Sequence, residues 1–316
     1  MGNVFVLLNS GAGTLHDSNG DAVVARIEEA LTATGDTVEV VTAPGGELRS
    51  RLEQRLSRDR PDTVIVGGGD GTVSGMAAAL CGTGIAMGIL PLGTMNLFAR
   101  SVGMPLDLDE SLAALAGART RKIDLGEVNG RIFTHHVSMG LQPRLVAMRE
   151  KADYGSRAGK IFATFRALLT IMRRPPRLQV RVTLEDEAFD LQTPALVVSN
   201  NMFGPDHLPY ADALDQGVLG IYICTSHHPA DVAQVTLEAL LGSWHARDRV
   251  KTLSGRSITV ERRSRRRQRI VATVDGELVN FDGAIEMKIR PGCLTVLAPE
   301  PAPPSEERVD AASPHP

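Results

Sequence analysis

The stretch VIVGGGDGTVSGMAAAL, from Val64 to Leu80, joins an apolar strand pattern to three glycines, an aspartate, another glycine and a threonine. The small apolar residues that follow predict a helix. Glycine lets a backbone approach a ligand closely, and the first turn of a helix offers free N–H groups and partial positive charge. The pattern therefore indicates an anion site, most often for phosphate, although a tight strand-to-helix turn would have the same pattern.

The residues on either side of this stretch alternate between strand and helix patterns. Strands are predicted at 3–8, 37–41, 63–66 and 85–90, and helices at 21–34, 47–57, 72–80 and from 96 onward. Such alternation predicts a parallel sheet covered by helices, in which ligands bind beyond the carboxyl ends of the strands. The four loops at that edge are NSGAG, TAPGG, GGGDGT and PLGTMN. All four carry small or polar residues, so we expect them to form one site.

The second half of the chain has a different pattern. Residues 123–298 consist mostly of strand patterns, with an Asn-Gly hairpin turn at Asn129–Gly130 and helices near 161–172 and 230–245. The end, 299–316, is rich in Pro, Ser and charged residues, and we expect it to be disordered. The predicted fold is an N-terminal parallel-sheet α/β nucleotide-binding domain, 1–122, followed by a C-terminal β-rich, β-sandwich-like domain, 123–298.

Composition and charge narrow the class of protein. The 316 residues are 43% apolar and 22% charged, with a net charge of −3, which is typical of a soluble globular protein and gives no global attraction for nucleic acid. Cys81, Cys224 and Cys293 are odd in number and lack paired spacing, so we expect no disulfide framework, no zinc site and a reducing compartment. No apolar run has the length of a membrane span. We therefore expect a cytoplasmic protein, with any membrane contact peripheral and on the inner face.

Three blocks resemble the diacylglycerol kinase catalytic-domain family of lipid kinases, which includes sphingosine kinases and YegS-like proteins. They are VIVGGGDGTVSGMAAAL, GILPLGTMNLFAR and, far downstream, VATVDGELV. Weaker matches are IDLGEVNGRIF, VSMGL, VVSNN and PYADALDQG, in the family's order. GGDGT alone also occurs in NAD kinases and phosphofructokinases. The resemblance implies an α/β nucleotide domain plus a β-rich domain, with an ATP- and Mg²⁺-dependent active site between them that phosphorylates a lipid hydroxyl.

The resemblance assigns the nucleotide-binding residues. Phosphoryl transfer depends on positioning phosphates and neutralising their charge, which backbone N–H groups in a glycine loop can help to do. The implied set is Asn9, Thr42, Gly67, Gly68, Gly69, Asp70, Gly71, Thr72, Thr94 and Asn96. From the residues alone, Asn9 and Asn96 fit helix caps or Asx turns equally well, and Thr42 fits a strand end.

Two carboxylates are the candidates for catalysis. A carboxylate inside a phosphate loop, such as Asp70, would repel a nucleotide unless it binds Mg²⁺ or the acceptor hydroxyl. Alternatively, Asp70 caps the following helix. Glu277 of VDGE is implied by the resemblance as the general base, yet Asp-Gly also forms hairpin turns, which would make Glu277 an exposed turn residue. The sequence leaves open which carboxylate is the base. Asp215 of PYADALDQG is a second candidate for metal binding.

The chain departs from the family pattern at several positions. Leu97 follows Asn96 where the family commonly has an acid, and Gln216 follows Asp215 where it usually has a second Asp. The first loop is NSGAG instead of an Asn-Pro form, with no lysine close behind it. A structural Mg²⁺ near Asp215 is therefore in doubt. His135 and His136 lack a visible acid or Ser partner, and we expect them to be structural.

Two segments suggest how a lipid kinase would reach a bilayer. In RAGKIFATFRALLTIMRRPP, an apolar helical face is flanked by basic residues, a pattern that fits an interfacial helix or an ordinary domain helix. Lys160 in this segment resembles a family lysine. In ERRSRRRQR, six arginines lie between Arg262 and Arg269 and would be attracted to anionic head groups or simply solvated. No aromatic residues alternate with them, which argues against nucleic-acid binding.

Other functions remain alternatives. A NAD kinase-like enzyme would use the same loop on a soluble substrate, and a relative without turnover would bind nucleotide or lipid only. A Rossmann dehydrogenase fits less well, because the glycines lack the G-x-G-x-x-G spacing. The sequence does not identify the acceptor lipid, for which diacylglycerol is the first candidate. A two-fold homodimer is the default oligomeric state.

Overall fold

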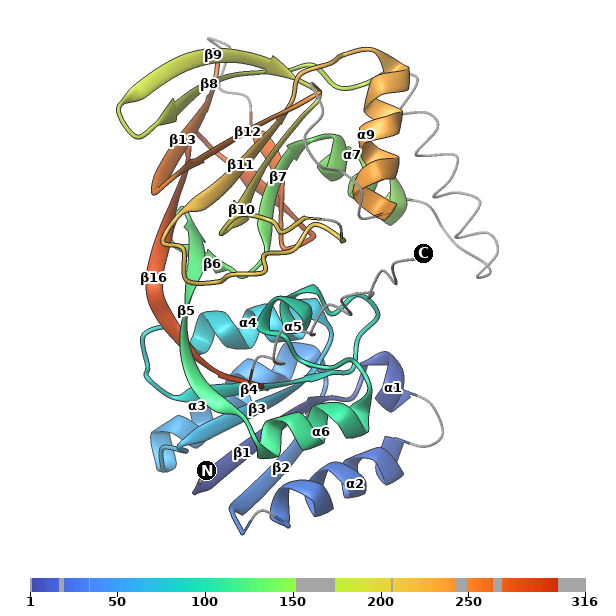
Figure 1. Cartoon of the computed structure of the whole chain (residues 1–316), viewed down its shortest axis with the longest axis vertical. Coiled ribbons are helices and arrows are strands. Elements are labelled where there is room, and N and C mark those ends of the chain that lie inside the picture. The colour runs from blue at the N-terminus through green and yellow to red at the C-terminus, as the bar shows by residue number, and fades with distance from the viewer. Residues whose placement is uncertain are drawn as a thin grey trace, which may run out of the picture.

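The computed structural model describes residues 2–16, 20–33, 35–151, 174–205, 207–241, 249–263 and 269–300. Figure 1 shows two lobes, with helices around strands in the first and mostly strands in the second. The predicted helix at 161–172, Lys160, most of the Arg262–Arg269 cluster and residues 301–316 of the predicted tail lie outside the described residues.

The first lobe contains the predicted parallel sheet. Its strands are β1 (Asn3–Asn9), β2 (Thr37–Ala43), β3 (Thr63–Gly68) and β4 (Ala86–Pro91), in the order β2-β1-β3-β4, and all of these pairs are parallel. The helices are α1 (Gly13–His16), α2 (Gly20–Thr32), α3 (Leu48–Arg58), α4 (Asp70–Leu80), α5 (Leu97–Val102) and α6 (Leu108–Ala116), with a 3₁₀ turn at Gly45–Glu47. Strands β3 and β4 are buried along their whole length because helices cover both faces.

The second lobe is a pair of facing sheets. Its elements are β5 (Arg119–Val128), β6 (Arg131–Phe133), β7 (His136–Gly140), α7 (Leu141–Lys151), β8 (Leu178–Leu184), β9 (Glu187–Thr193), β10 (Ala195–Asn200), β11 (Leu219–Cys224), α9 (Pro229–Leu241), β12 (Val250–Gly255), β13 (Ser257–Arg262), β14 (Ile270–Val274), β15 (Glu277–Phe281) and β16 (Ile285–Ala298). One sheet has the order β12-β11-β10-β7-β14-β15, and β5, β6, β8, β9, β13 and β16 belong to the other. The predicted Asn129–Gly130 turn joins β5 to β6, with positive φ at both residues. The predicted α/β plus β-sandwich-like fold is confirmed.

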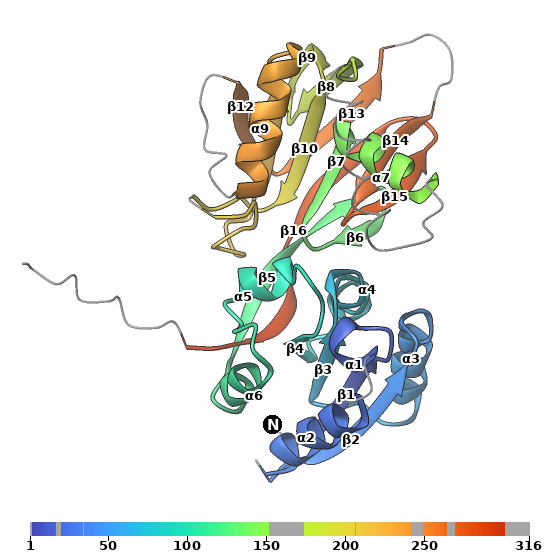
Figure 2. The ribbon, with the colours of Figure 1, turned by 90° about the vertical axis from the view of Figure 1, so that its right-hand side faces the viewer.

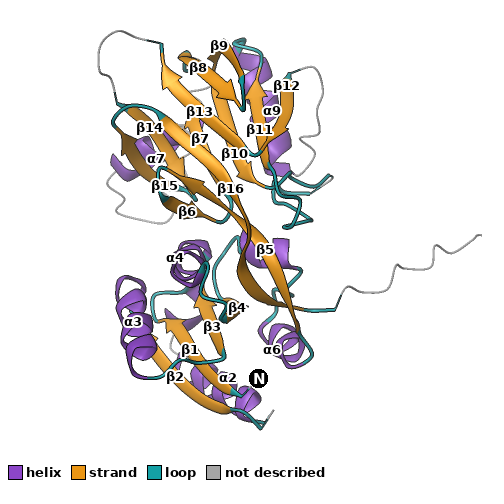
Figure 3. Ribbon diagram, turned by 90° about the vertical axis from the view of Figure 1, so that its left-hand side faces the viewer, coloured by secondary structure: helices purple, strands orange, loops and turns teal. Residues whose placement is uncertain are grey.

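Strand β16 belongs to both lobes, a feature that the sequence did not predict. Its first part pairs with β13 and contributes Ile285, Met287 and Ile289 to the core between the two sheets. Its last part pairs with β4 and packs into the core of the first lobe. Between them, the pairing of β16 with β5 shifts register between Arg290 and Leu294. Figure 3 shows β5 and β16 crossing together from one lobe to the other. The predicted boundary between residues 122 and 123 thus lies within a strand that serves both lobes.

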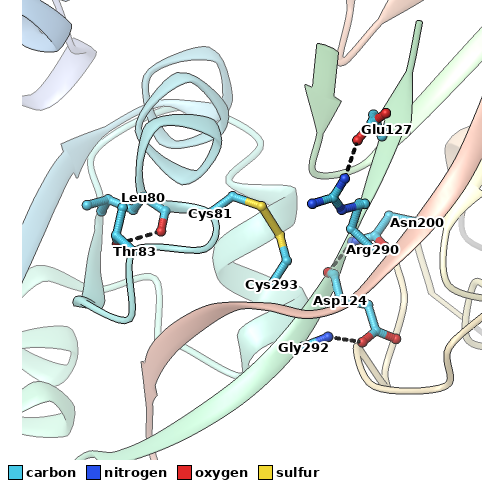
Figure 4. Close-up of a disulfide and its surroundings, with 9 residues drawn as sticks. All are labelled: Leu80, Cys81, Thr83, Asp124, Glu127, Asn200, Arg290, Gly292 and Cys293. Carbon is cyan, nitrogen blue, oxygen red and sulfur yellow. Dashed lines mark hydrogen bonds and ion pairs between the residues drawn. A yellow bond between two sulfur atoms is a disulfide. The ribbon is translucent and has the colours of Figure 1, made fainter. Parts of the chain in front are cut away.

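The cysteine pattern argued against a disulfide framework, but Cys81 is bonded to Cys293 (Figure 4). Cys81 follows α4 and Cys293 lies on β16, 212 residues further along the chain, and Cys224 is buried and free. Only the return of β16 to the first lobe brings the two cysteines together, so their spacing along the chain carries no signal. A crosslink closing a long loop typically contributes about 2–4 kcal/mol. The cysteines therefore no longer argue for a reducing compartment. Among the helices described, none has the length and apolar character to cross a membrane.

Candidate active site

The glycine loop between β3 and α4 is closely packed on one side and open on the other. A Cβ at Gly67 would lie 2.5 Å from Leu8 Cδ2, and one at Gly68 would lie 2.7 Å from Cβ of Thr72. A Cβ at Gly71, in the first turn of α4, would meet no atom within 4 Å, and this residue is exposed. The first turn of α4 therefore has unobstructed space beside the N–H groups that the helix leaves without intrahelical partners.

The β4–α5 loop lies directly against this glycine loop. A Cβ at Gly93 would lie 2.4 Å from Cα of Gly69, so the two backbones touch. Asn96 holds its own loop: its Oδ1 accepts from the N–H of Gly93 at 3.0 Å, and its Nδ2 donates to the carbonyl of Gly93 at 2.9 Å. Asn96 has a positive φ of 50°, which Asn tolerates better than most residues. Its side chain is buried and bonds backward within the loop, to Gly93 and to the carbonyl of Pro91, so it forms neither the Asx turn nor the side-chain helix cap that the residue type alone suggested.

The loop after β1 is joined to α4 by a side-chain hydrogen bond. Nδ2 of Asn9 donates to Oγ1 of Thr72 at 2.7 Å, and Oδ1 of Asn9 accepts from the N–H of Gly11 at 2.9 Å. The structure thus brings together three of the predicted loops through Asn9, Thr72 and the Gly69–Gly93 contact. Thr42, on β2, and Thr94, in the β4–α5 loop, are both exposed at the same sheet edge.

Asp70 links the glycine loop to α5. Its Oδ1 accepts the backbone N–H of Phe98, in the first turn of α5, at 3.3 Å. A carboxylate at that place offsets the partial positive charge at the start of the helix. Leu97, where the family commonly has an acid, is the first residue of α5, so Asp70 supplies an acceptor to a helix whose own first turn contains no acid.

The turn between β14 and β15 is organised by Asp275, a residue that was not among the sequence predictions. Its Oδ1 accepts the N–H groups of His135 and His136 at 2.9 and 3.1 Å. Its Oδ2 accepts the N–H and the hydroxyl of Thr134 at 2.8 and 3.1 Å, and the hydroxyl of Ser74. Ser74 lies on α4, one turn after Asp70, so this hydrogen bond joins the helix of the glycine loop to the VDGE turn. The sequence contained no signal for this contact, because Ser74 and Asp275 are 201 residues apart.

Glu277 lies two residues beyond Asp275 and has a different environment. Its side chain is 64% exposed, and Oε2 forms an ion pair with Nη2 of Arg131 at 2.6 Å. Arg131 begins β6, next to the Asn129–Gly130 turn. Glu277 is therefore an exposed residue at a hairpin turn, placed on the α4 side of the second lobe by its neighbour Asp275.

The PYADALDQG segment is held by a buried carboxylate, Asp124 of β5. Asp124 is 3% exposed and accepts the N–H of Gly217 at 2.7 Å. It also accepts the N–H of Gly292 at 2.8 Å (Figure 4). Asp215 is 57% exposed and forms an ion pair with Arg121 at 3.4 Å. Gln216 bonds within its own region, since its side-chain oxygen accepts from the N–H of Met202. Within the described parts of the chain, no three His, Cys, Asp or Glu side chains gather as a metal site.

Two histidine rings lie beside the Asp275 turn. Burial lowers the pKa of His135 well below its usual value, and the neighbouring His136 lowers it further. Burial also lowers the pKa of His136, although its hydrogen bond to Gln142 and the nearby Asp275 carboxylate act in the opposite direction. The rings meet edge to face, 4.5 Å apart. Both histidines are neutral parts of the second lobe near pH 7, in agreement with their predicted structural role.

Comparison with known proteins agrees with this architecture. Residues 3–128 match the diacylglycerol kinase catalytic domain, and residues 136–298 match the YegS C-terminal NAD kinase beta sandwich-like domain. A Pseudomonas aeruginosa protein named "Probable lipid kinase YegS-like" is 32% identical over 282 residues, which cover 83% of this chain and 85% of that protein. An uncharacterised Synechocystis protein is 28% identical over 283 residues, covering 85% of this chain and 63% of its own length.

Solved structures have the same fold. A crystal structure of a diacylglycerol kinase from Bacillus anthracis superposes with a TM-score of 0.70 at 18% identity, covering 95% of this chain and 97% of that one. The α/β domain with its glycine loop and the β-sandwich-like domain define a two-domain kinase class. This chain belongs to the family of YegS-like lipid kinases that contain a diacylglycerol kinase catalytic domain. The resemblance drawn from the sequence is confirmed.

Proposed function

We propose that this protein transfers the γ-phosphoryl group of ATP, in the presence of Mg²⁺, to the hydroxyl of a diacylglycerol-like lipid. The observation that carries the proposal is the hydrogen bond from Ser74 of α4 to Asp275. It links the helix that follows the glycine loop to the turn that contains Glu277, so a phosphate-binding element and a carboxylate adjoin each other across the two lobes. Family membership supports the lipid class of the acceptor.

The nucleotide would bind at the carboxyl edge of the parallel sheet. Gly71 would let the phosphates come close to the open first turn of α4, which offers N–H donors and partial positive charge. Gly67, Gly68 and Gly69 would complete the binding loop, and their missing side chains let neighbouring residues pack against it. Asn9, Thr72, Asn96, Thr42 and Thr94 surround that edge. Asn9 and Asn96 would act mainly by holding the loops in shape, because their polar atoms already bond to protein.

The donor set fits a Mg²⁺ ion that arrives with the nucleotide. Mg²⁺ is commonly held by one or two carboxylates together with substrate phosphates and water, instead of a protein cage. Asp70 supplies a carboxylate beside the glycine loop, and only its Oδ1 bonds to protein among the described residues. Bound there, the ion would neutralise phosphate charge. Asp215, already paired with Arg121, would contribute at most through water.

Glu277 would accept the proton of the lipid hydroxyl. Oε2 of its carboxylate forms an ion pair with Arg131, and Oε1 has no hydrogen-bond or ion-pair partner among the described residues. The acceptor hydroxyl would donate to Oε1, while Arg131 holds the carboxylate in place through Oε2. Asp275 would not serve as the base, because protein donors already occupy both of its oxygens.

The test replaces Glu277 and follows labelled phosphate from ATP. Loss of a positioned general base typically lowers kcat by 10²- to 10⁴-fold, so Glu277→Gln should lose activity to about that extent and keep its ATP affinity. Glu187→Gln, at an exposed glutamate on β9, is the matched control and should remain fully active. Full activity in Glu277→Gln, or a parallel loss of ATP affinity, would contradict the assignment.

The acceptor is tested in the same assay. Diacylglycerol, phosphatidylglycerol, a sphingoid base and NAD are offered separately, and products are separated by thin-layer chromatography. Labelled phosphate on diacylglycerol would support the proposed acceptor. Label on NAD alone would replace it with a soluble acceptor, and ATP binding without product on any acceptor would indicate a relative that has lost turnover.

A further inference from the structure

A cavity of about 270 Å³ lies in the second lobe, where the two sheets and α7 meet. Its lining comes from the start of α7, the residues leading into β8, the end of β13 and the start of β14. The lining residues with charge are Arg144, Arg177, Arg262 and Arg269. We call this the arginine-rimmed cavity. Figure 2 shows α7 lying over β14 and β7, with the ends of β13 and β8 above them.

The charge of this cavity is one-sided. Its described lining contains the four arginines and no carboxylate. Among the described residues, the only acid paired with any of them is Asp282, whose Oδ1 lies 3.0 Å from Nε of Arg269. Arg262 donates to the backbone carbonyl of Arg269 at 3.2 Å, which positions it without neutralising it. Like charges held around one cavity repel each other, and an anion bound between them would relieve that cost.

The floor of the cavity is apolar. Pro143, Pro176 and Ile270 are buried there, with Ala147 and Leu178 half-buried beside them. Val271, also part of the lining, is 43% exposed, an unusual position for a valine on a strand. A bare phosphate ion would contact the arginines and leave this apolar surface wet. An amphiphile with an anionic head and apolar carbons would satisfy both parts.

The size of the cavity limits how much of such a molecule fits. Pockets for small molecules generally start at roughly 300 Å³, so this cavity accommodates a head group with its glycerol carbons and not a whole lipid. The acyl chains would remain outside, in the bilayer. No aromatic side chain belongs to the described lining, so bases of a nucleic acid would find no stacking partner.

The cavity is separate from the proposed site of phosphoryl transfer. Ile270 begins β14 and Asp275 directly follows its last residue, so the two lie roughly 17 Å apart along an extended strand. The β14–β15 hairpin therefore has the arginine-rimmed cavity at one end and Glu277 at the other. A lipid bound in the cavity would not be the molecule that is phosphorylated.

We propose that the arginine-rimmed cavity binds the phosphate head group of an anionic phospholipid and thereby docks the second lobe on an anionic membrane surface. This function lies beyond the proposed kinase reaction and does not depend on it, because binding alone tests it. It gives Arg262 and Arg269, the two ends of the basic cluster, a role together with Arg144 and Arg177, which the sequence places far from them.

The experiment measures sedimentation of the full chain with vesicles of phosphatidylglycerol and phosphatidylcholine in equal parts, and with phosphatidylcholine alone. The double variant Arg144→Gln, Arg177→Gln removes two rim charges at exposed positions. The matched control, Arg58→Gln with Arg256→Gln, removes two exposed charges outside the cavity. Each basic residue near an anionic surface contributes about 1 kcal/mol, so the rim variant should bind roughly 30-fold more weakly and the control within about twofold of wild type.

A further variant separates the cavity from its charge. Ala147→Leu fills part of the floor, keeps the net charge and suits a helix, and it should weaken vesicle binding severalfold. Thermal unfolding of each variant checks that the fold survives. Glycerol 3-phosphate, the soluble head-group fragment, should compete with the vesicles for wild type and not for the rim variant.

Several results would overturn the proposal. Equal losses in the rim variant and the control would mean that diffuse charge, and not the cavity, attracts the membrane. If wild type does not sediment with phosphatidylglycerol vesicles, a membrane phospholipid is excluded as the ligand of the cavity. Binding of glycerol 3-phosphate in that case would assign the cavity to a soluble phosphate ester. Stronger binding of a single-stranded oligonucleotide than of vesicles, lost in the rim variant, would assign it to nucleic acid.

Discussion

The two turns that α4 brings together, the glycine loop after β3 and the Asp275–Glu277 turn after β14, are built on opposite principles. The glycine loop owes its shape to missing side chains, with Gly69 and Gly93 in backbone contact. The second turn owes its shape to one side chain, because the Asp275 carboxylate accepts hydrogen bonds from Thr134, His135, His136 and Ser74.

This difference shows which part of the site is complete without a ligand. The carboxylate of Asp275 is saturated by protein donors, so the turn is already in its final form and presents Glu277 outward. The first turn of α4 borders open space at Gly71, and a helix start has N–H groups without intrahelical partners that a ligand would complete. We therefore expect substitutions in the second turn to act on stability first, and substitutions in the glycine loop to act on nucleotide affinity.

The largest effect should come from exchanging a carboxylate for an amide at Asp275. Asp275→Asn keeps the size and the tolerance for its positive φ of 47°, but it turns an NH₂ group toward backbone donors. Each unsatisfied donor costs about 1–3 kcal/mol, so we expect the free energy of unfolding to fall by about 2–4 kcal/mol, measured by urea denaturation.

Glu277→Gln is the matched control for this change. It makes the same chemical exchange two residues away, and because Glu277 is exposed with a single ion pair, it should alter stability by less than about 1 kcal/mol. Comparable losses of stability in both variants would contradict the assignment of Asp275 as a structural carboxylate and Glu277 as an exposed one.

A smaller effect is expected from adding a methyl group to the glycine loops. Gly93→Ala would place a Cβ 2.4 Å from Cα of Gly69 and must push the two loops apart, which should cost about 1–3 kcal/mol and weaken ATP binding. Gly71→Ala meets nothing within 4 Å and lies in a helix, where Ala is favoured over Gly by about 0.5–1 kcal/mol.

The informative measurement is ATP affinity in the Gly71 variant. If the phosphates approach the backbone at the start of α4, Gly71→Ala should unfold at a higher temperature and yet bind ATP more weakly. Unchanged ATP affinity in Gly71→Ala would place the phosphates elsewhere along the loop, and unchanged stability in Gly93→Ala would show that the loops can separate freely.

The sequence predicted the features that depend on local pattern. The strand and helix periods indicated the parallel sheet, and the glycine loop with its later VDGE partner indicated the family. It did not predict Asp275 as an organising residue, because its partners Ser74 and Thr134 are distant in sequence and ordinary in type. It also did not predict the disulfide, since only the return of β16 to the first lobe brings Cys293 next to Cys81. Contacts that depend on the docking of distant strands leave no local pattern to recognise.

The smallest expected effect is a pH dependence of the free energy of unfolding, which arises from the two histidines beside the second turn and not from the glycine loop. The pKa of His135 is held well below its usual value of 6.5 by burial, and that of His136 is lowered as well. Near pH 7 both rings are neutral in the folded and the unfolded chain. As the pH falls below 6.5, the unfolded chain takes up protons that the folded protein resists, so stability decreases with falling pH. The loss continues down to the folded-state pKa values and then levels off.

One such histidine should lower the free energy of unfolding by about 1 kcal/mol between about pH 7 and 5.5, since the slope of this free energy against pH approaches roughly 1.4 kcal/mol per pH unit. We expect His135→Gln to lose less stability than wild type over this interval, as measured by urea denaturation at each pH. Because His135 donates its backbone N–H to Asp275, and Gln keeps that N–H, the turn itself should survive the substitution. An identical pH dependence in the variant would mean that the ring is not a source of the slope. A change of ATP affinity with the same profile would show that the two turns do not act separately.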